Sequence, residues 1–165
     1  MIILTDASRD LYLAKRYDEA IEQYQKSLLI DANFAIAHKG LAEVYAQTGK
    51  HEDAILEIEK AIALSGNSIF ILDDLGYIYA RAGKKEEALK VLEDLNRLAS
   101  DEYVPSYGRA VIFAALARKD EAIASLERAY QERSFLVYLK VDPAFDGIRE
   151  DDRFMELMDK LGLLN

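Results

Sequence analysis

The sequence predicts an all-helical domain of four consecutive helix pairs, closed at its C-terminal end by one further helix. Three observations lead to this fold class. The chain of 165 residues contains only two prolines, so helices can run through nearly all of it. Its 51% hydrophobic and 31% charged residues are typical of a folded domain rather than a disordered one. Most informatively, a short motif returns at a fixed interval, as repeat architectures require.

The repeated motif is two acidic residues, an alanine and a branched aliphatic residue. Its alanines are 34 residues apart: Ala20, Ala54, Ala88 and Ala122. The same interval separates small residues at the eighth position of each unit, which are Ser8, Ala42, Gly76 and Ala110. It also separates large apolar residues, first Leu11, Tyr45, Tyr79 and Phe113, then Tyr24, Ile58, Leu92 and Leu126. Small residues facing large ones at helical spacing indicate two helices that approach closely within each unit.

The expected helices follow from this pattern in chain order. They cover 2–14 and 17–30, 34–47 and 51–64, 68–81 and 85–98, and 104–117 and 120–132. Gly49 and Gly83 stand where a first helix must end, a position that often needs a positive φ angle. Acidic residues begin each second helix, where the helix dipole favours them. Pro105 is expected in the first turn of its helix, and residues 66–68 separate two units.

Residues 135–165 are expected to belong to the same domain and to cap it. Residues 150–162 predict a helix with one apolar stripe, formed by Phe154, Leu157, Met158 and Leu161. The preceding apolar residues should cover the exposed face of the last repeat: Phe135, Leu136, Tyr138, Val141, Phe145 and Ile148. The acidic residues of this region do not follow the spacing of a calcium loop, which favours helix capping: Asp142, Asp146, Glu150, Asp151 and Asp152.

A period of 34 residues with these residue types resembles the tetratricopeptide repeat. The second and third units carry the resemblance best, with Leu41, Ala42, Tyr45, Gly49 and Ala54, then Leu75, Gly76, Tyr79, Gly83 and Ala88. It covers residues 1–134 as four repeats, 1–34, 35–68, 69–102 and 103–134. It implies a right-handed α-α superhelix (TPR solenoid) of four helix-turn-helix repeats plus a C-terminal capping helix. The family's early tryptophan is replaced by Leu4, His38, Leu72 and Ser106, and Arg109 occupies a leucine position.

The resemblance also implies where a partner would bind. In this family the first helices line a concave groove, which here would contain Arg9, Tyr12, Lys39, Glu43, Phe70, Asp73, Asp74, Tyr77, Arg81 and Tyr107. The resemblance therefore implies a non-enzymatic scaffold that binds a protein or peptide. Aromatic residues beside Gly40 and Gly108 suit a helix or extended peptide with apolar anchors. The carboxylate clamp of chaperone-binding relatives is absent, because its positions hold Thr5, Arg9, Gly40, Phe70 and Asp74.

Composition excludes several other classes of function. A formal net charge of −9 argues against nucleic acid and against an anionic membrane surface. No apolar run is long enough to cross a bilayer. Without cysteine there is no disulfide or thiolate, which fits a cytoplasmic protein. His38 and His51 do not have metal-ligand spacing, and His38 is expected to serve packing. We expect no catalytic residue, metal or cofactor.

Two further functions stay open at this stage. Ile2, Ile3 and Leu4 begin the first helix without a polar cap, so a second copy could pair there as a homodimer. A small molecule could instead occupy the groove. The ending Ala129–Ser134, Leu136–Pro143 and Asp152–Phe154 resembles that of bacterial repeat proteins whose array follows a signalling module. It implies the docking or sensor part of a longer signalling protein, whose partner the sequence does not name.

Overall fold

The computed structural model describes the backbone of residues 2–66, 68–100, 103–134 and 136–164. Side chains are described over the same ranges except at residues 2–4, 69 and 70. Within these ranges the elements are α1 (Ile2–Leu13), α2 (Tyr17–Ile30), α3 (Ala35–Gln47), α4 (His51–Leu64), α5 (Ile69–Arg81), α6 (Lys85–Leu98), α7 (Ser106–Ala115), α8 (Lys119–Gln131), the 3₁₀ helix η1 (Pro143–Ile148) and α9 (Asp152–Lys160). The all-helical expectation is confirmed.

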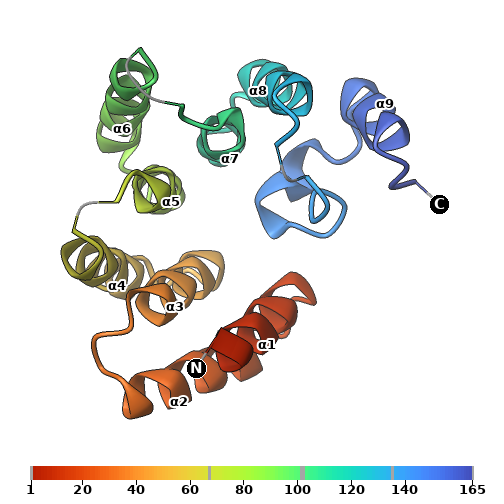
Figure 1. The fold of residues 1–165 in the computed structure, drawn as a ribbon. Helices are drawn as coiled ribbons and strands as arrows, with labels where there is room; N and C mark the ends of the chain where they lie inside the picture. Colours follow the sequence, from red (N-terminus) through yellow and green to blue (C-terminus); the bar gives the residue numbers. More distant parts are fainter. Residues whose placement is uncertain (1, 67, 101–102, 135, 165) are drawn as a thin grey trace.

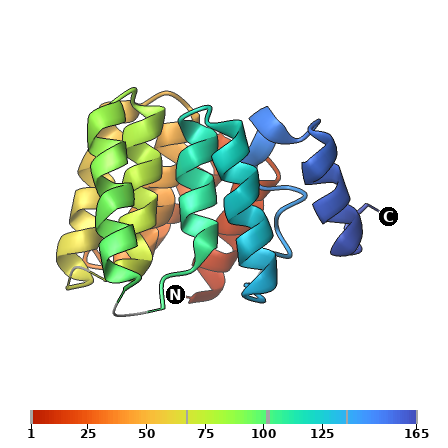
Figure 2. The same cartoon turned by 90° about the horizontal axis from the view of Figure 1, so that it is seen from above.

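The helix pairs form a curved array. Figure 1 shows α1, α3, α5 and α7 on its inner side and α2, α4, α6 and α8 on its outer side. Viewed from above, α5, α6, α7 and α8 stand next to one another and α9 follows at the end, while α1 lies behind them (Figure 2). The first helix of each pair therefore contributes to one concave face. In the described chain, no helix has both the length and the apolar character needed to cross a membrane.

The periodic small residues hold the array together. Ala20, Ala54, Ala88 and Ala122 are all fully buried, at 0% exposure, as the 34-residue pattern predicts. Gly76 shows why the eighth position must be small, because a Cβ atom there would lie 2.5 Å from Ile112 Cδ1 of the next repeat. Such contacts bring neighbouring helices to close packing distance, where van der Waals contact is greatest.

His38 and Arg109 are large polar residues at buried positions of the array, and each has hydrogen-bond partners. His38 is buried, with its Nδ1 2.5 Å from Glu57 Oε2 and its Nε2 3.0 Å from the carbonyl of Ala32. Arg109 is also buried and donates from one terminal nitrogen to Val104 O and Ser106 Oγ, both at 3.2 Å. These contacts satisfy both ring nitrogens of His38 and one terminal nitrogen of Arg109, whereas Arg109 Nη1 is buried without a partner among the described residues. His38 thus has the packing role expected for it.

Two helices, α7 and α9, are shorter by several residues than the sequence suggests. The helix expected over 104–117 is α7, because Pro105 has an extended ψ of 136° and precedes the first helical residue, Ser106. Pro105 is therefore the N-cap and does not lie in the first turn. The helix expected over 150–162 is α9, whose start is set by Asp151, since its carboxylate accepts a hydrogen bond from the backbone N–H of Arg153.

All four first helices end in the same way. The residue two positions beyond the helix has a positive φ, at Lys15 (59°), Gly49 (78°), Gly83 (74°) and Ala117 (58°). The next residue is always basic and donates its N–H to the carbonyl of the residue at the eleventh position, at 2.8 to 2.9 Å, in the pairs Arg16–Leu11, Lys50–Tyr45, Lys84–Tyr79 and Arg118–Phe113. This is the Schellman ending. The 34-residue repeat therefore determines the turns between paired helices as well as the buried positions.

Ala117→Gly should stabilise the protein, because a residue with a Cβ atom is strained at positive φ and glycine is not. We expect the free energy of unfolding to rise by about 0.5 kcal/mol after the greater chain entropy of glycine is counted. The matched control is Ala124→Gly at an exposed position inside α8, which should lower it by about 1 kcal/mol. Urea unfolding measures both, and two changes of the same sign would contradict the strain at Ala117.

Candidate binding site on the concave face

The C-terminal segment does more than cover the last repeat. Residues 136–149, called the bridge segment below, also reach the first repeat across the concave face. Lys15 Nζ lies 2.6 Å from Asp146 Oδ2, and the guanidinium of Arg9 lies over the ring of Tyr138, 5.2 Å from its centroid. Figure 1 shows this segment opposite α1. The two ends of the curved array are thereby joined.

The end of the bridge segment near the fourth repeat is buried in the core. Phe145 is fully buried and packs edge-on against Tyr107, with ring centroids 5.6 Å apart. Leu136 and Ile148 are buried as the sequence predicts, whereas Val141 is 43% exposed. Leu139 is fully buried and was not anticipated, and Phe135 lies outside the described residues. The expected cover is therefore confirmed for three of its six members, Leu136, Phe145 and Ile148, while Tyr138 is half-buried.

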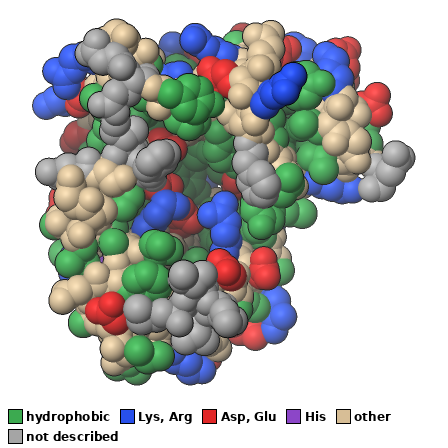
Figure 3. Space-filling view, in the orientation of Figure 1, with side chains coloured by type: hydrophobic (Ala, Val, Ile, Leu, Met, Phe, Trp, Pro, Cys, Tyr) green, Lys and Arg blue, Asp and Glu red, His purple; other side chains and the backbone are tan. Residues whose placement is uncertain are grey.

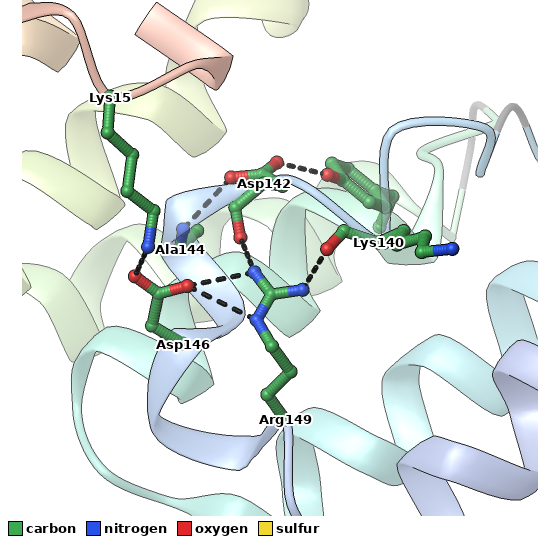
Figure 4. A network of polar contacts seen from close by, with 7 residues as sticks. Lys15, Lys140, Asp142, Ala144, Asp146 and Arg149 are labelled. Atoms are coloured by element: carbon green, nitrogen blue, oxygen red, sulfur yellow. Dashed lines mark hydrogen bonds and ion pairs between the residues drawn. The ribbon is translucent and has the colours of Figure 1, made fainter. Parts of the chain in front are cut away.

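A polar network fixes the shape of the bridge segment (Figure 4). Arg149 donates hydrogen bonds to the backbone carbonyls of Lys140 and Asp142 and to the carboxylate of Asp146. Asp142 accepts from the backbone N–H of Ala144 at 2.9 Å and from the hydroxyl of Tyr107 at 2.5 Å. One guanidinium thus binds three acceptors of the same segment, and the Tyr107 hydroxyl connects the bridge segment to α7.

The bridge segment closes part of the concave face into a cavity of about 190 Å³. The hollow is visible at the centre of the molecule in Figure 3. Its wall contains Arg9, Tyr12, Lys39, Glu43, Asp73, Asp74, Tyr77, Tyr107, Val111, Asp142 and Ala144. Eight of the ten groove residues expected from the sequence are therefore brought together. Of the other two, Arg81 is exposed and is not among the lining residues, and the side chain of Phe70 lies outside the described residues.

Carboxylates outnumber cations in this wall. Four carboxylates, on Glu43, Asp73, Asp74 and Asp142, face two cations, on Arg9 and Lys39. Burial raises the pKa of Asp73, Asp74 and Asp142 above the ordinary value. Burial also opposes ionisation of Glu43, but the charges of Lys39 and Arg9 outweigh it and lower that pKa. The wall therefore holds more negative groups than its own cations balance.

Lys39 lies within a cluster of these carboxylates. Its Nζ is 2.6 Å from Glu43 Oε1 on the same helix and 3.2 Å from Asp74 Oδ2 on the next first helix. Burial alone would lower the pKa of Lys39, but Asp74 and Glu43 raise it. The ammonium therefore stays charged, and it ties α3 to α5 across the concave face.

Three tyrosines complete the wall. Burial raises the pKa of Tyr12, Tyr77 and Tyr107, so all three hydroxyls are protonated at neutral pH. The hydroxyl of Tyr107 bonds to Asp142. The hydroxyl of Tyr77, which is only 3% exposed, makes no hydrogen bond of normal geometry to a described residue, and the side chain of Tyr12 is its polar neighbour. A buried polar atom without a partner costs about 1–3 kcal/mol, so it indicates a place where a ligand atom could bind.

Sequence reasoning missed the contribution of the bridge segment to this wall. Asp142 was expected only to cap a helix, which it does through Ala144, but its second oxygen meets Tyr107 beside the cavity. The available signal was an acidic residue between Val141 and Pro143 in a segment of buried apolar residues. Among the described residues, no three or more histidine and acidic side chains converge closely enough to hold a metal ion.

Comparison with known families agrees with the geometry. A family model described as TPR repeat matches residues 9–49. Two models described as tetratricopeptide repeat match residues 40–68 and 74–136. Together these matches cover most of the helix pairs. A search of curated proteins finds no match to the chain.

Arg149→Ala should loosen the bridge segment, because it removes the donor shared by three acceptors. Hydrogen bonds to a charged group are worth about 1.5–3 kcal/mol, so the free energy of opening residues 136–149 should fall by about 2 kcal/mol. Hydrogen–deuterium exchange measures this as faster exchange in that segment. Arg97→Ala, at an arginine 77% exposed, is the control and should change nothing there. Unchanged exchange in Arg149→Ala would show that this network does not stabilise the bridge segment.

Asp73→Asn should make the fold more stable at neutral pH. Burial raises the pKa of Asp73 above its ordinary value of 3.8 in the folded protein. The free energy of unfolding therefore falls as the pH rises past 3.8. Asparagine carries no charge and avoids this loss, which is worth about 1.4 kcal/mol for each unit of pKa shift. Urea unfolding should show the variant's advantage at neutral pH and no advantage below pH 3.8. The exposed Asp159→Asn should show none at either pH, and an equal gain there would contradict the burial argument.

Proposed function

Because the chain belongs to the tetratricopeptide-repeat family, whose repeats generally mediate protein–protein interaction, we propose that it is a non-enzymatic scaffold that binds a partner protein through its concave face. The observation that carries this proposal is the convergence of α1, α3, α5 and α7 on one polar and aromatic cavity. Helices that served packing alone would fill this space with apolar side chains.

The bridge segment favours one kind of partner over another. Its contacts with Arg9, Lys15 and Tyr107 occupy a part of the concave face where a bound helix would lie. A cavity of about 190 Å³ has room for one side chain. We therefore favour an extended peptide that inserts a side chain, of the two forms of partner that the sequence allows.

The same cavity supports a second candidate function, the binding of a small molecule by the sensor part of a longer regulator. A wall with buried polar groups is typical of small-ligand sites. Pairing of two copies through Ile2, Ile3 and Leu4 rests on side chains outside the described residues. The cytoplasmic location and the place within a signalling protein stay predictions from the sequence.

Arg9→Ala and Arg81→Ala should weaken partner binding, because both arginines are exposed on first helices and arginine is a frequent interface anchor. Affinity capture from a lysate of the source cells, with mass spectrometry, should show about a tenfold loss of the retained partner, which corresponds to about 1.4 kcal/mol. Arg97→Ala on the outer helix α6 is the matched control and should retain it fully. Full retention by both groove variants would exclude the concave face as the binding surface.

A further inference from the structure

The cations of the cavity wall are already engaged. Lys39 is held by Glu43 and Asp74, and the guanidinium of Arg9 stacks on Tyr138 of the bridge segment. An anionic ligand would have to replace these contacts and would meet further carboxylates in the same wall. The electrostatics of the cavity therefore disfavour an anion.

The acidic groups, in contrast, lack enough counter-charge. Asp73 and Asp142 make hydrogen bonds to backbone N–H groups, at 3.1 Å from Asp74 N and 2.9 Å from Ala144 N, and no lysine or arginine forms an ion pair with either carboxylate among the described contacts. Without a counter-ion, burial favours their protonated forms. A cation in the cavity would stabilise them as carboxylates.

The tyrosine side chains supply the second, independent observation. The hydroxyl of Tyr77 is buried and makes no hydrogen bond of normal geometry among the described residues, and Tyr77 lines the cavity. Burial raises the pKa of this hydroxyl, and the side chain of Tyr12 lies close enough to offset part of that rise. A hydroxyl oxygen accepts a hydrogen bond from an ammonium, and the rings of Tyr12 and Tyr107 in the same wall attract cations through their faces. Each of these groups complements a donor that carries positive charge.

The volume of the cavity limits the size of this donor. At about 190 Å³ it is larger than an engineered cavity of about 150 Å³ that accepts benzene, and smaller than the roughly 300–1,000 Å³ of drug-sized sites. A group of lysine side-chain length fits this range.

We propose that the cavity between the first helices and the bridge segment binds a primary alkylammonium group. The group can belong to a free amine or to a lysine side chain of a bound peptide. The inference deepens the proposed function, since it rests on the same concave face and names the chemistry recognised there.

The test uses the full chain and n-butylammonium as the probe in isothermal titration calorimetry. We expect saturable binding of n-butylammonium and none of 1-butanol or butyrate, which have similar size but lack the positive charge. Tyr77→Phe removes one oxygen atom and should weaken binding several-fold. Asp73→Asn should weaken it about tenfold, as the loss of one charged partner predicts.

The choice of variants also controls for loss of folding. Asp73→Asn is expected to be the more stable protein, so its weaker binding cannot come from unfolding. Asp159→Asn removes the same charge from α9 and should bind n-butylammonium as the wild type does. Equal binding of 1-butanol, tighter binding of Mg²⁺ or Ca²⁺ than of the amine, or unchanged affinity in both Asp73→Asn and Tyr77→Phe would overturn the inference.

A second arm separates the two sources of the ammonium. N-acetyl-lysine-methylamide that binds at least as tightly as n-butylammonium indicates a peptide side chain, whereas binding of the free amine alone indicates a small metabolite; either result supports the cation site. If no ammonium binds while partner capture still depends on Arg9 and Arg81, the inference fails and the proposed function stands. If the ammonium probe binds while partner capture does not depend on Arg9 and Arg81, the inference stands and the proposed function fails.

Discussion

The interlocking of small residues once every 34 positions is the constraint on which the rest of the structure depends. The buried alanines at 20, 54, 88 and 122 allow each second helix to lie close against its first helix. Gly76 does the same between repeats, where its missing Cβ atom leaves room for Ile112. This spacing sets the curvature of the array, and the curvature brings Lys15 of the first repeat within reach of Asp146 in the bridge segment.

The concave face combines this rigid frame with an electrostatic imbalance. Apolar residues at its inner positions would be more stable, since burying carboxylates beyond the available cations costs free energy. Proteins commonly keep such costly groups where they bind something. The buried acids around Lys39 and the buried hydroxyl of Tyr77 fit that explanation. The same groups would bind a ligand and lower the stability of the free protein.

The sequence predicted most of the frame from helical periodicity, and its resemblance to the tetratricopeptide repeat predicted most of the cavity wall. Lys39 and Tyr77 stand at repeat positions that line the groove in that family, and both line the cavity here. Pro105 was misplaced by local reasoning, since a proline fits both the first turn and the position before it. The bridge could not be derived, because the contact between Lys15 and Asp146 joins residues 131 positions apart and belongs to no repeat.

The distance between the first repeat and the bridge segment in solution tests most directly whether this segment closes the concave face. The sequence has no cysteine, so a cysteine pair at the exposed positions Ala14 and Gly147 can carry two spin labels without further changes. Double electron–electron resonance should give one narrow distribution at the short end of its range, which broadens when Arg149→Ala is added. A broad or long distribution in the otherwise unchanged protein would show that the bridge does not close the concave face.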